Sequence, residues 1–172
     1  MKQINAIIYK SYTGHTKQYA EMLGKKTGIA VFELENAKKE LPKNSSIIYM
    51  GWLMAGSIKG YKDVVKLFSV KAVCGVGMAA NSAQYDDIKK ANNIPDTMPL
   101  FCLQGGFEME KLGGIYKLMM NIMKNTLGKK IAEKQDRTPD EEEMLELLIN
   151  GGNRVSPENL TELNTWLAED NV

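Results

Sequence analysis

The segment from Ser11 to Thr16, with the sequence S-Y-T-G-H-T, places aliphatic hydroxyl groups around a glycine. The hydroxyls of Ser11, Thr13 and Thr16 are spaced to surround a monophosphate, and Gly14 allows the backbone to approach it closely. The segment follows an apolar run and opens a helical pattern, so its N–H groups lie where a helix N-terminus favours an anion. This loop therefore predicts a phosphate site that needs no arginine.

Three other interpretations of this loop have to be weighed. A Ser/Thr/Gly cluster after a strand is often only a turn and a helix cap, and the six residues alone do not exclude this. The chain has no Walker A motif, because Gly24-Lys25-Lys26-Thr27 lacks the upstream glycine. The loop also lacks the G-x-G-x-x-G pattern of dinucleotide-binding proteins. A nucleoside triphosphate and NAD are therefore weaker candidates than a monophosphate.

The elements that must position this loop alternate along the chain. Apolar runs rich in β-branched residues predict strands at residues 4–9, 29–34, 46–51, 71–78 and 99–103. Helical periodicity predicts helices at residues 15–26, around 64–68, and at 86–91, 110–127, 140–149 and 158–167. A polar stretch that carries Lys38, Lys39 and Pro42 follows the second strand, and residues 129–137 and 150–154 are interpreted as polar connectors.

This alternation is typical of an α/β fold with a parallel sheet. Several of the strands are continuous apolar runs, as expected when helices cover both faces of the sheet. The length of 172 residues fits one domain, residues 1–172. The pairs Thr138-Pro139 and Ser156-Pro157 predict the starts of the last two helices, because each places a capping hydroxyl before a proline.

Composition excludes several classes of function. The chain has 44% hydrophobic residues, 25% charged residues and a formal net charge of +1, with no zinc-finger or RNP-type motif, so we expect no nucleic-acid binding. Cys74 and Cys102 lie in apolar runs without metal-ligand spacing and are interpreted as core residues. No apolar run approaches the roughly 18 residues of a transmembrane segment, and no signal peptide is recognised, so we expect a cytoplasmic protein.

The loop S-Y-T-G-H-T resembles the [T/S]-x-T-G-x-T phosphate loop of flavodoxins. The resemblance implies a three-layer sandwich with a five-stranded parallel sheet of order 2-1-3-4-5, here with extra helices after strand five. It also implies that the cofactor is FMN, bound at the carboxyl ends of strands one, three and four. Tyr12 and His15 are expected to contribute mainly backbone, and the His15 side chain is expected to face solvent. The implied phosphate contacts are Ser11, Thr13, Gly14 and Thr16.

Two further loops correspond in position to the flavodoxin loops that flank the isoalloxazine ring. Trp52 begins the first of them, and either packs on the ring or lies in the core beneath the loop. The expected ring-contacting residues of this loop are Trp52, Leu53, Met54, Ala55 and Gly56. Those of the loop after the fourth strand are Ala79, Ala80 and Asn81.

Residues 105–124, G-G-F-E-M-E-K-L-G-G-I-Y-K-L-M-M-N-I-M-K, resemble the same stretch of flavodoxin-domain proteins related to bacterial protoporphyrinogen dehydrogenase. The two resemblances imply electron transfer through bound FMN, with a redox partner protein or a small hydrophobic donor or acceptor. The alternative is a flavin-dependent oxidoreductase acting on a quinone- or porphyrinogen-like substrate. A third interpretation, a binding module without cofactor, is disfavoured by the complete phosphate loop.

The predicted helix at residues 110–127 has two apolar stripes, of which one is enough to dock it on the sheet. Either the helix at 140–149 covers the second stripe, or that stripe forms a homodimer or a hydrophobic pocket near the flavin. We expect Met120 and Met123 to take part in such a contact. The first stripe comprises Ile115, Leu118, Met119 and Ile122. The second comprises Tyr116, Met120, Met123 and Leu127.

Overall fold

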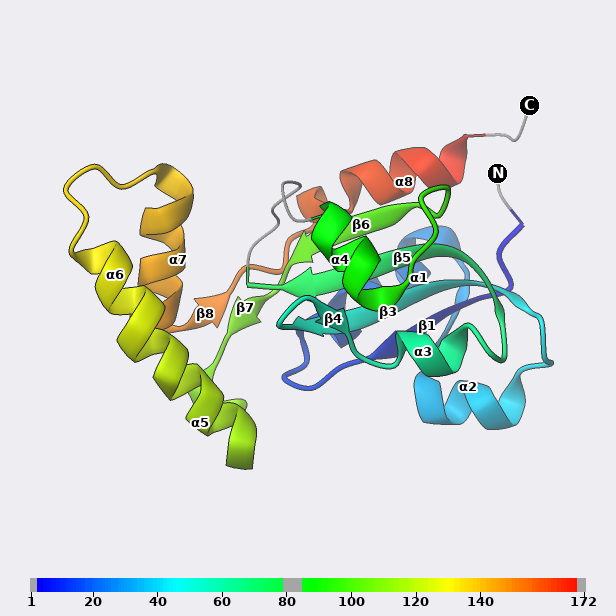
Figure 1. The fold of residues 1–172 in the computed structure, drawn as a ribbon. Helices are drawn as coiled ribbons and strands as arrows, with labels where there is room; N and C mark the ends of the chain where they lie inside the picture. Colours follow the sequence, from blue (N-terminus) through cyan, green and yellow to red (C-terminus); the bar gives the residue numbers. More distant parts are fainter. Residues whose placement is uncertain (1–2, 79–84, 170–172) are drawn as a thin grey trace.

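The computed structural model of the chain describes residues 3–78 and 85–169. It is an α/β fold in which a mostly parallel central sheet lies between helices (Figure 1). The predicted ring-contacting residues Ala79, Ala80 and Asn81 lie outside the described residues. Within residues 3–78 and 85–169, no helix combines the length and the apolar character that crossing a bilayer requires.

The central sheet has five parallel strands in the order β2-β1-β3-β5-β6. These strands are β1 (Ala6–Lys10), β2 (Ala30–Glu33), β3 (Ser46–Met54), β5 (Ser69–Gly77) and β6 (Leu100–Gln104). A sixth strand, β4 (Ser57–Ile58), pairs antiparallel with β3 beside this path. The sheet is therefore mixed rather than purely parallel. The strand numbers differ from the expected order 2-1-3-4-5 because β3 extends beyond residue 51 and turns back as a hairpin, which adds strand β4.

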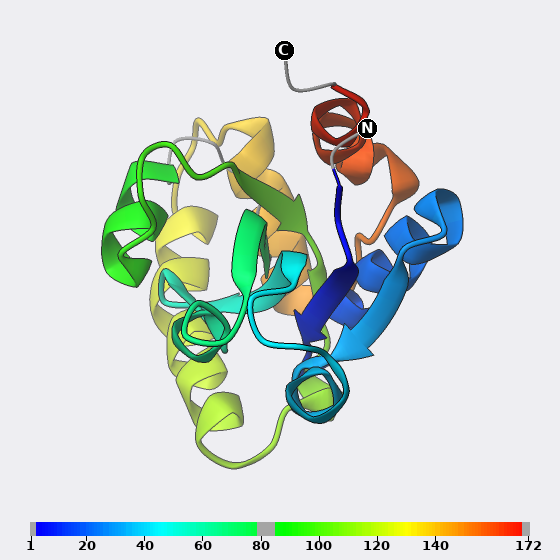
Figure 2. The same cartoon turned by 90° about the vertical axis from the view of Figure 1, so that its right-hand side faces the viewer.

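Helices cover both faces of the sheet, as the continuous apolar strands predict. One face packs against α1 (His15–Thr27) and α8 (Thr161–Ala168), which share a core with Ile7, Ile48 and Cys74. The other packs against α2 (Leu34–Glu40), α3 (Tyr61–Val64) and α4 (Tyr85–Asn92), around the alternate residues Ile8 and Tyr49. Figure 2 shows α1 and α8 to the right of the sheet and α3 and α4 to the left.

Helix α2 lies in the polar stretch that carries Lys38 and Lys39, where the sequence predicts no helix. The sequence L-E-N-A-K-K-E buries Leu34 and Ala37, which are three residues apart and so lie on one face of the helix. The sequence predicts that Leu34 ends the second strand, whereas β2 ends at Glu33. Two apolar positions are too few for the periodicity to stand out from the surrounding charges.

A helical arm, residues 108–151, stands beside the sheet after β6 (Figure 1). Its two ends are joined by a short antiparallel ribbon formed by β7 (Gly106–Phe107) and β8 (Gly152–Asn153). A 3-10 turn follows β8 at Pro157–Leu160 and leads into α8. The arm comprises a 3-10 turn at Met109–Lys111, α5 (Gly114–Met123), a π-helical turn at Lys124–Gly128, α6 (Lys129–Ala132) and α7 (Pro139–Asn150).

Two boundaries in the arm differ from the predictions. The expected helix at residues 110–127 begins only at Gly114, because Gly113 has an extended backbone conformation. It then continues into the predicted connector at residues 129–137, where α6 buries Ile131 and packs on α7. Residues 150–154, also predicted as a connector, contribute strand β8.

The phenol of Tyr19 joins α1 to the carboxyl end of the sheet. Its side chain is fully buried, and its hydroxyl donates to the carbonyl oxygen of Gln104. The same hydroxyl accepts from Asn159 Nδ2 at 2.6 Å and from the backbone N–H of Ser156 at 3.4 Å. This hydrogen-bond network fixes the chain after the arm to the edge of the sheet where the predicted site lies.

We therefore expect the substitution Tyr19→Phe to lower the free energy of unfolding by about 1–3 kcal/mol, because it leaves buried polar groups without their partner. Urea denaturation followed by circular dichroism measures this. Tyr12→Phe is the matched control, because Tyr12 is 42% exposed. Equal stability of the two variants would contradict a structural role for the Tyr19 hydroxyl.

Candidate functional site

The predicted phosphate loop connects strand β1, which lies between β2 and β3, to helix α1. Gly14 precedes the helix with φ of +99°, a conformation that favours glycine. Its N–H donates to Ser11 Oγ at 3.1 Å, which closes the loop into a tight turn. The loop therefore folds as a compact turn at the helix N-terminus, as its sequence predicts.

Within the described part of the chain, no side chain caps the N-terminus of α1. The first N–H groups of a helix have no partner inside the helix, so at this end they remain available to an anion. Thr16, in the first turn, is only 1% exposed and lines the cavity described below. An uncapped helix end with a buried hydroxyl beside it provides both the charge and the donors that a phosphate needs.

His15 corrects the expectation of a solvent-facing side chain. It is only 4% exposed, and its Nδ1 lies 2.9 Å from Thr13 Oγ1. Its Nε2 has no hydrogen-bond partner among the described residues. The ring packs against the backbone at Gly105 and Gly106, where an added Cβ would come within 2.9–3.2 Å of its atoms. The side chain is buried because the chain between β6 and β7 places Gly105 and Gly106 over the start of α1.

Burial governs the protonation of His15. Desolvation lowers the pKa of the imidazole below its ordinary value, and the opposing effect of the nearby Glu108 carboxylate is smaller. Lys111 acts in the same direction as burial. His15 is therefore neutral around pH 7, with one ring nitrogen used by Thr13 and the other unpaired.

We expect this burial to appear as a pH dependence of stability. Because the pKa is lowered in the folded state, the contribution of neutral His15 is complete above its unfolded pKa of about 6.5 and is lost as the pH falls below it. His15→Asn should therefore lower the free energy of unfolding more at about pH 7.5 than at about pH 5.5. Unfolding titrations of both proteins at the two pH values measure this difference. A pH-independent difference would contradict it.

The second predicted loop is the turn of the β3–β4 hairpin. Ala55 and Gly56 form the turn with φ of +48° and +76°, the combination of a type I′ hairpin. Asn92, at the end of α4, is 3% exposed and fixes this hairpin. Its Nδ2 donates to the carbonyl of Gly56 at 2.7 Å, and its Oδ1 accepts from the N–H of Ile58 at 2.8 Å. Sequence reasoning missed Asn92, which belongs to no recognisable motif.

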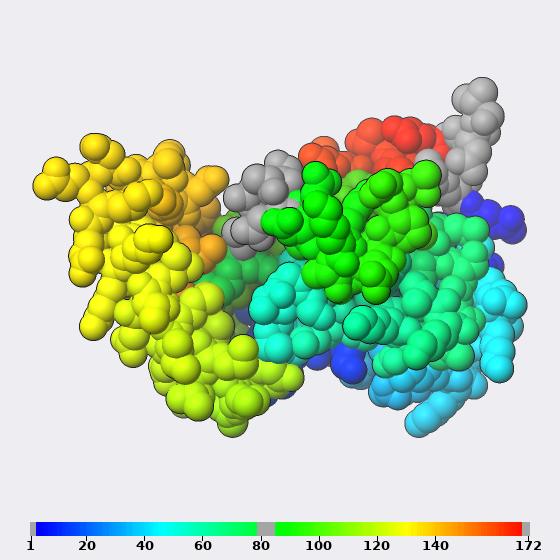
Figure 3. Space-filling view, viewed as in Figure 1, coloured from blue at the N-terminus to red at the C-terminus, as the bar shows by residue number. Residues whose placement is uncertain are grey.

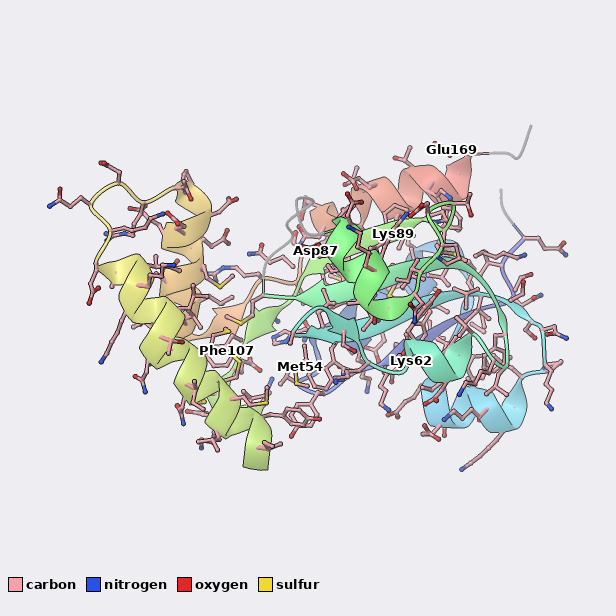
Figure 4. All side chains as sticks on the ribbon, viewed as in Figure 1. Met54, Lys62, Asp87, Lys89, Phe107 and Glu169 are labelled. Carbon is pink, nitrogen blue, oxygen red and sulfur yellow. The ribbon has the colours of Figure 1, made fainter. Side chains whose placement is uncertain are left out.

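A cavity of about 580 Å³ lies between these two loops and the helical arm. Figure 3 shows the hollow between the arm and the sheet. In Figure 4, Met54 and Phe107 lie in the space between α5 and the sheet. The predicted residues that line it are Tyr12, Thr13, His15, Thr16, Trp52, Leu53, Met54, Ala55 and Gly56. The structure therefore brings together both predicted loops that it describes.

Two predicted residues occupy the loop without lining the cavity. Ser11 uses its hydroxyl to accept from Gly14, and Gly14 itself shapes the turn. Of the lining residues in the described part of the chain, Glu108 is the one with an ionisable carboxylate, and it forms an ion pair with Lys111. The cavity is therefore mainly apolar, with its anion-binding groups at one end, the α1 N-terminus.

Trp52 lies on the cavity side of its loop and not in the core beneath it. Its ring centroid is 5.4 Å from that of Tyr12 and 5.4 Å from that of Tyr116, which belongs to α5. Tyr12 and Tyr116 are 5.0 Å apart with their rings at 70°. Three aromatic rings from three separate elements are thus in contact at the wall of the cavity. Tyr116 was not predicted as part of this cluster.

The stripes of the arm helix are arranged differently from the prediction. The first stripe does not dock on the sheet, because Ile115 and Leu118 are 67% and 60% exposed. The second stripe lines the cavity, and so do Met119 and Ile122 of the first stripe. A flavin beside this apolar wall and a homodimer both stay predictions. The lining residues from the arm include Tyr116, Met119, Met120, Met123, Leu127 and Met144.

The two cysteines behave as core residues. Cys74 is fully buried, and burial raises the pKa of its thiol far above the ordinary range. Cys102 is half-buried, and desolvation raises the pKa of its thiol to about 11. Both thiols are therefore protonated near neutral pH and poorly nucleophilic. No group of three or more metal-ligating side chains occurs among residues 3–78 and 85–169.

Comparison with known proteins gives no match. No protein-family model, curated protein or solved structure matches this chain. The interpretation of the cavity therefore rests on its own geometry: an uncapped helix end, a glycine turn, an aromatic cluster and a methionine-rich wall.

Proposed function

We propose that the chain is an FMN-binding protein with a flavodoxin-like fold that transfers electrons through the bound flavin. The observation that carries the proposal is the uncapped N-terminus of α1, preceded by the Gly14 turn and opening into a large apolar cavity. FMN combines a phosphate with a flat, largely apolar ring. The two ends of this cavity have the matching chemistry, anion donors at one and aromatic and methionine side chains at the other.

The position of the cavity in the sheet supports the proposal. The chain leaves β1 towards β2 on one side and returns to β3 on the other, so β1 and β3 are the neighbours between which the direction of winding reverses. Ligands of open α/β sheets bind at such switch points, outside the carboxyl ends of the strands. The loops after β1 and β3 both line the cavity.

In this proposal each part of the site has a separate task. The N–H groups at the start of α1 and the Thr16 hydroxyl hold the phosphate, and Trp52 lies beside the ring. The β3–β4 hairpin is kept in place by Asn92, so the ring-flanking backbone is already ordered. The flavin, when bound, supplies the electron-transfer chemistry.

The methionine-rich wall favours a second candidate, an oxidoreductase that reduces or oxidises a hydrophobic quinone- or porphyrinogen-like molecule. Met119, Met120 and Met123 from α5 and Met144 from α7 line the cavity with apolar side chains. Methionine is polarizable and adapts to varied apolar shapes. A carrier that reacts only with protein partners does not need this additional apolar space.

Titration of the purified protein, freed of ligand, with FMN and with riboflavin tests the proposal. We expect a micromolar or lower dissociation constant for FMN, and binding of riboflavin weaker by at least about tenfold, because riboflavin lacks the charged group. Flavin fluorescence and the visible absorption spectrum report both. Equal affinity for FMN and riboflavin would show that the α1 N-terminus is not a phosphate site.

A further inference from the structure

The helical arm is joined to the rest of the chain through a narrow ribbon. Gly106 and Gly152 lie in its two strands with φ of +148° and +141°. A Cβ added at Gly106 would lie 2.3 Å from the carbonyl oxygen of Gly152, so the two backbones leave no room for a side chain here. A two-stranded ribbon has little stability of its own. The position of the arm must therefore depend on contacts that the arm makes elsewhere.

The two limbs of the arm make different contacts with the sheet. Helix α7 buries Leu147 against the ribbon, beside Gly152, and Leu148 within the arm, beside Gly128. It is also tied to β6 by the hydrogen bond from Gln104 Nε2 to Glu143 Oε1 at 3.0 Å. Helix α5, in contrast, has no buried residue along its length, Gly114–Met123. α7 is thus the fixed limb and α5 the weakly held one.

Helix α5 reaches the sheet side of the cavity through the ring of Tyr116. This ring meets the Tyr12 ring edge-on at 5.0 Å and the Trp52 ring nearly at right angles at 5.4 Å. The phenol is half-buried, whereas Ile115, its neighbour in sequence, is 67% exposed. The aromatic contacts of Tyr116 therefore join α5 to the two loops, whereas the outer face of the helix is exposed.

We propose that α5 is a lid over the cavity and that Tyr116 is the residue that keeps it closed. It does so by contacting Tyr12 and Trp52, and it contacts the flavin ring once FMN is bound. The contact between Tyr116 and the flavin rests on the proposed function. The physical reason is that a flat aromatic ring at the mouth of an apolar cavity excludes water and offers a favourable edge or face to another ring. Lid opening then limits both entry and release of the ligand.

The fluorescence of Trp52 tests the closed contact without any ligand. The chain has two tryptophans, so the experiment uses a Trp166→Phe background in which Trp52 is the one emitter. In this background Tyr116→Leu keeps an apolar side chain but removes the ring, and Tyr116→Phe keeps the ring. We expect the leucine variant to shift Trp52 emission to longer wavelength and to raise its acrylamide quenching constant about twofold or more. The phenylalanine variant should match its parent.

Stopped-flow kinetics with FMN tests the lid. Tyr116→Leu should raise both the association and the dissociation rate constant, the latter by about tenfold, which corresponds to about 1.4 kcal/mol and suits the loss of two aromatic contacts. Tyr116→Phe should change either by less than about twofold. A rise in the dissociation rate constant alone would overturn the lid, since it indicates a contact without gating. Unchanged Trp52 quenching in the leucine variant would overturn the closed contact.

The outcomes separate this proposal from the proposed function. If the parent protein binds no FMN, the proposed function fails, and the lid over the flavin fails with it. Trp52 quenching then still decides whether Tyr116 closes the cavity. If FMN binds tightly but neither rate constant changes in Tyr116→Leu, the proposed function stands and the lid is wrong.

Discussion

Removing the hydroxyl of Thr16 is expected to weaken FMN binding about ten- to hundredfold. The hydroxyl would hydrogen-bond a charged phosphate, and such a bond contributes about 1.5–3 kcal/mol. Thr16 is a sharper choice than Thr13, because Thr13 Oγ1 already lies 2.9 Å from His15 Nδ1. Thr16 is 1% exposed, so its substitution must preserve packing, and valine does this. Fluorescence titration with FMN gives the dissociation constant.

The matched control is Thr16→Ser, which keeps the hydroxyl and should bind FMN within about threefold of the parent. Riboflavin is the second control, because its affinity should be the same in all three proteins. If valine lowers the affinity for riboflavin as much as that for FMN, the substitution has disturbed the cavity and the phosphate assignment loses its support. If valine lowers neither, Thr16 does not contact the ligand.

The elements that position this loop could be predicted because their signals are local. Helix α1 begins at His15 as expected and ends at Gly28, which has φ of +74°. Thr138 caps α7 in a reciprocal capping box with Glu141, as the Thr-Pro start indicates. The continuous apolar runs predict strands buried on both faces, and the structure confirms a mostly parallel sheet between two helical layers.

What could not be predicted depends on contacts between distant segments. The side chain of His15 is buried by Gly105 and Gly106, about 90 residues further along the chain. The β3–β4 hairpin escaped prediction because its first turn residue is Ala55, although positive φ at that position usually selects asparagine, aspartate or glycine. Alanine is held there by tertiary contacts, among them the hydrogen bond from Asn92 to the Gly56 carbonyl.

The orientation of helix α5 in the arm could not be predicted from the sequence either. Periodicity identifies two apolar stripes on one helix, but it does not decide which residues face inward, because both stripes are apolar. In the structure, Met119 and Ile122 of the first stripe line the cavity together with the second stripe. Ile115 and Leu118 are exposed and do not line it.

This arrangement leads to the second prediction, for the double variant Met120→Glu and Met123→Glu. Two carboxylates on the cavity wall are expected to lower the second-order rate constant for flavin reoxidation by an apolar quinone at least about a hundredfold. The reason is that an apolar contact of a methionine side chain contributes up to about 1.5–3 kcal/mol, and a desolvated charge opposes binding. The rate with ferricyanide, a polar acceptor that needs no apolar site, should change by less than about threefold. Both rates are measured on the FMN-loaded protein after chemical reduction.

The chain offers a matched control on the same helix. Ile115→Glu together with Leu118→Glu adds the same charge to α5 on its exposed side, and should leave both rates within about twofold of the parent. Sedimentation of all three proteins tests the homodimer, since loss of a dimer only in the cavity variant would place Met120 and Met123 at a subunit contact. If the cavity variant unfolds while the outer variant stays folded, the stripe is structural core and the substrate hypothesis is wrong. If both variants lose quinone reduction equally, the helix acts through its charge and not through its methionines.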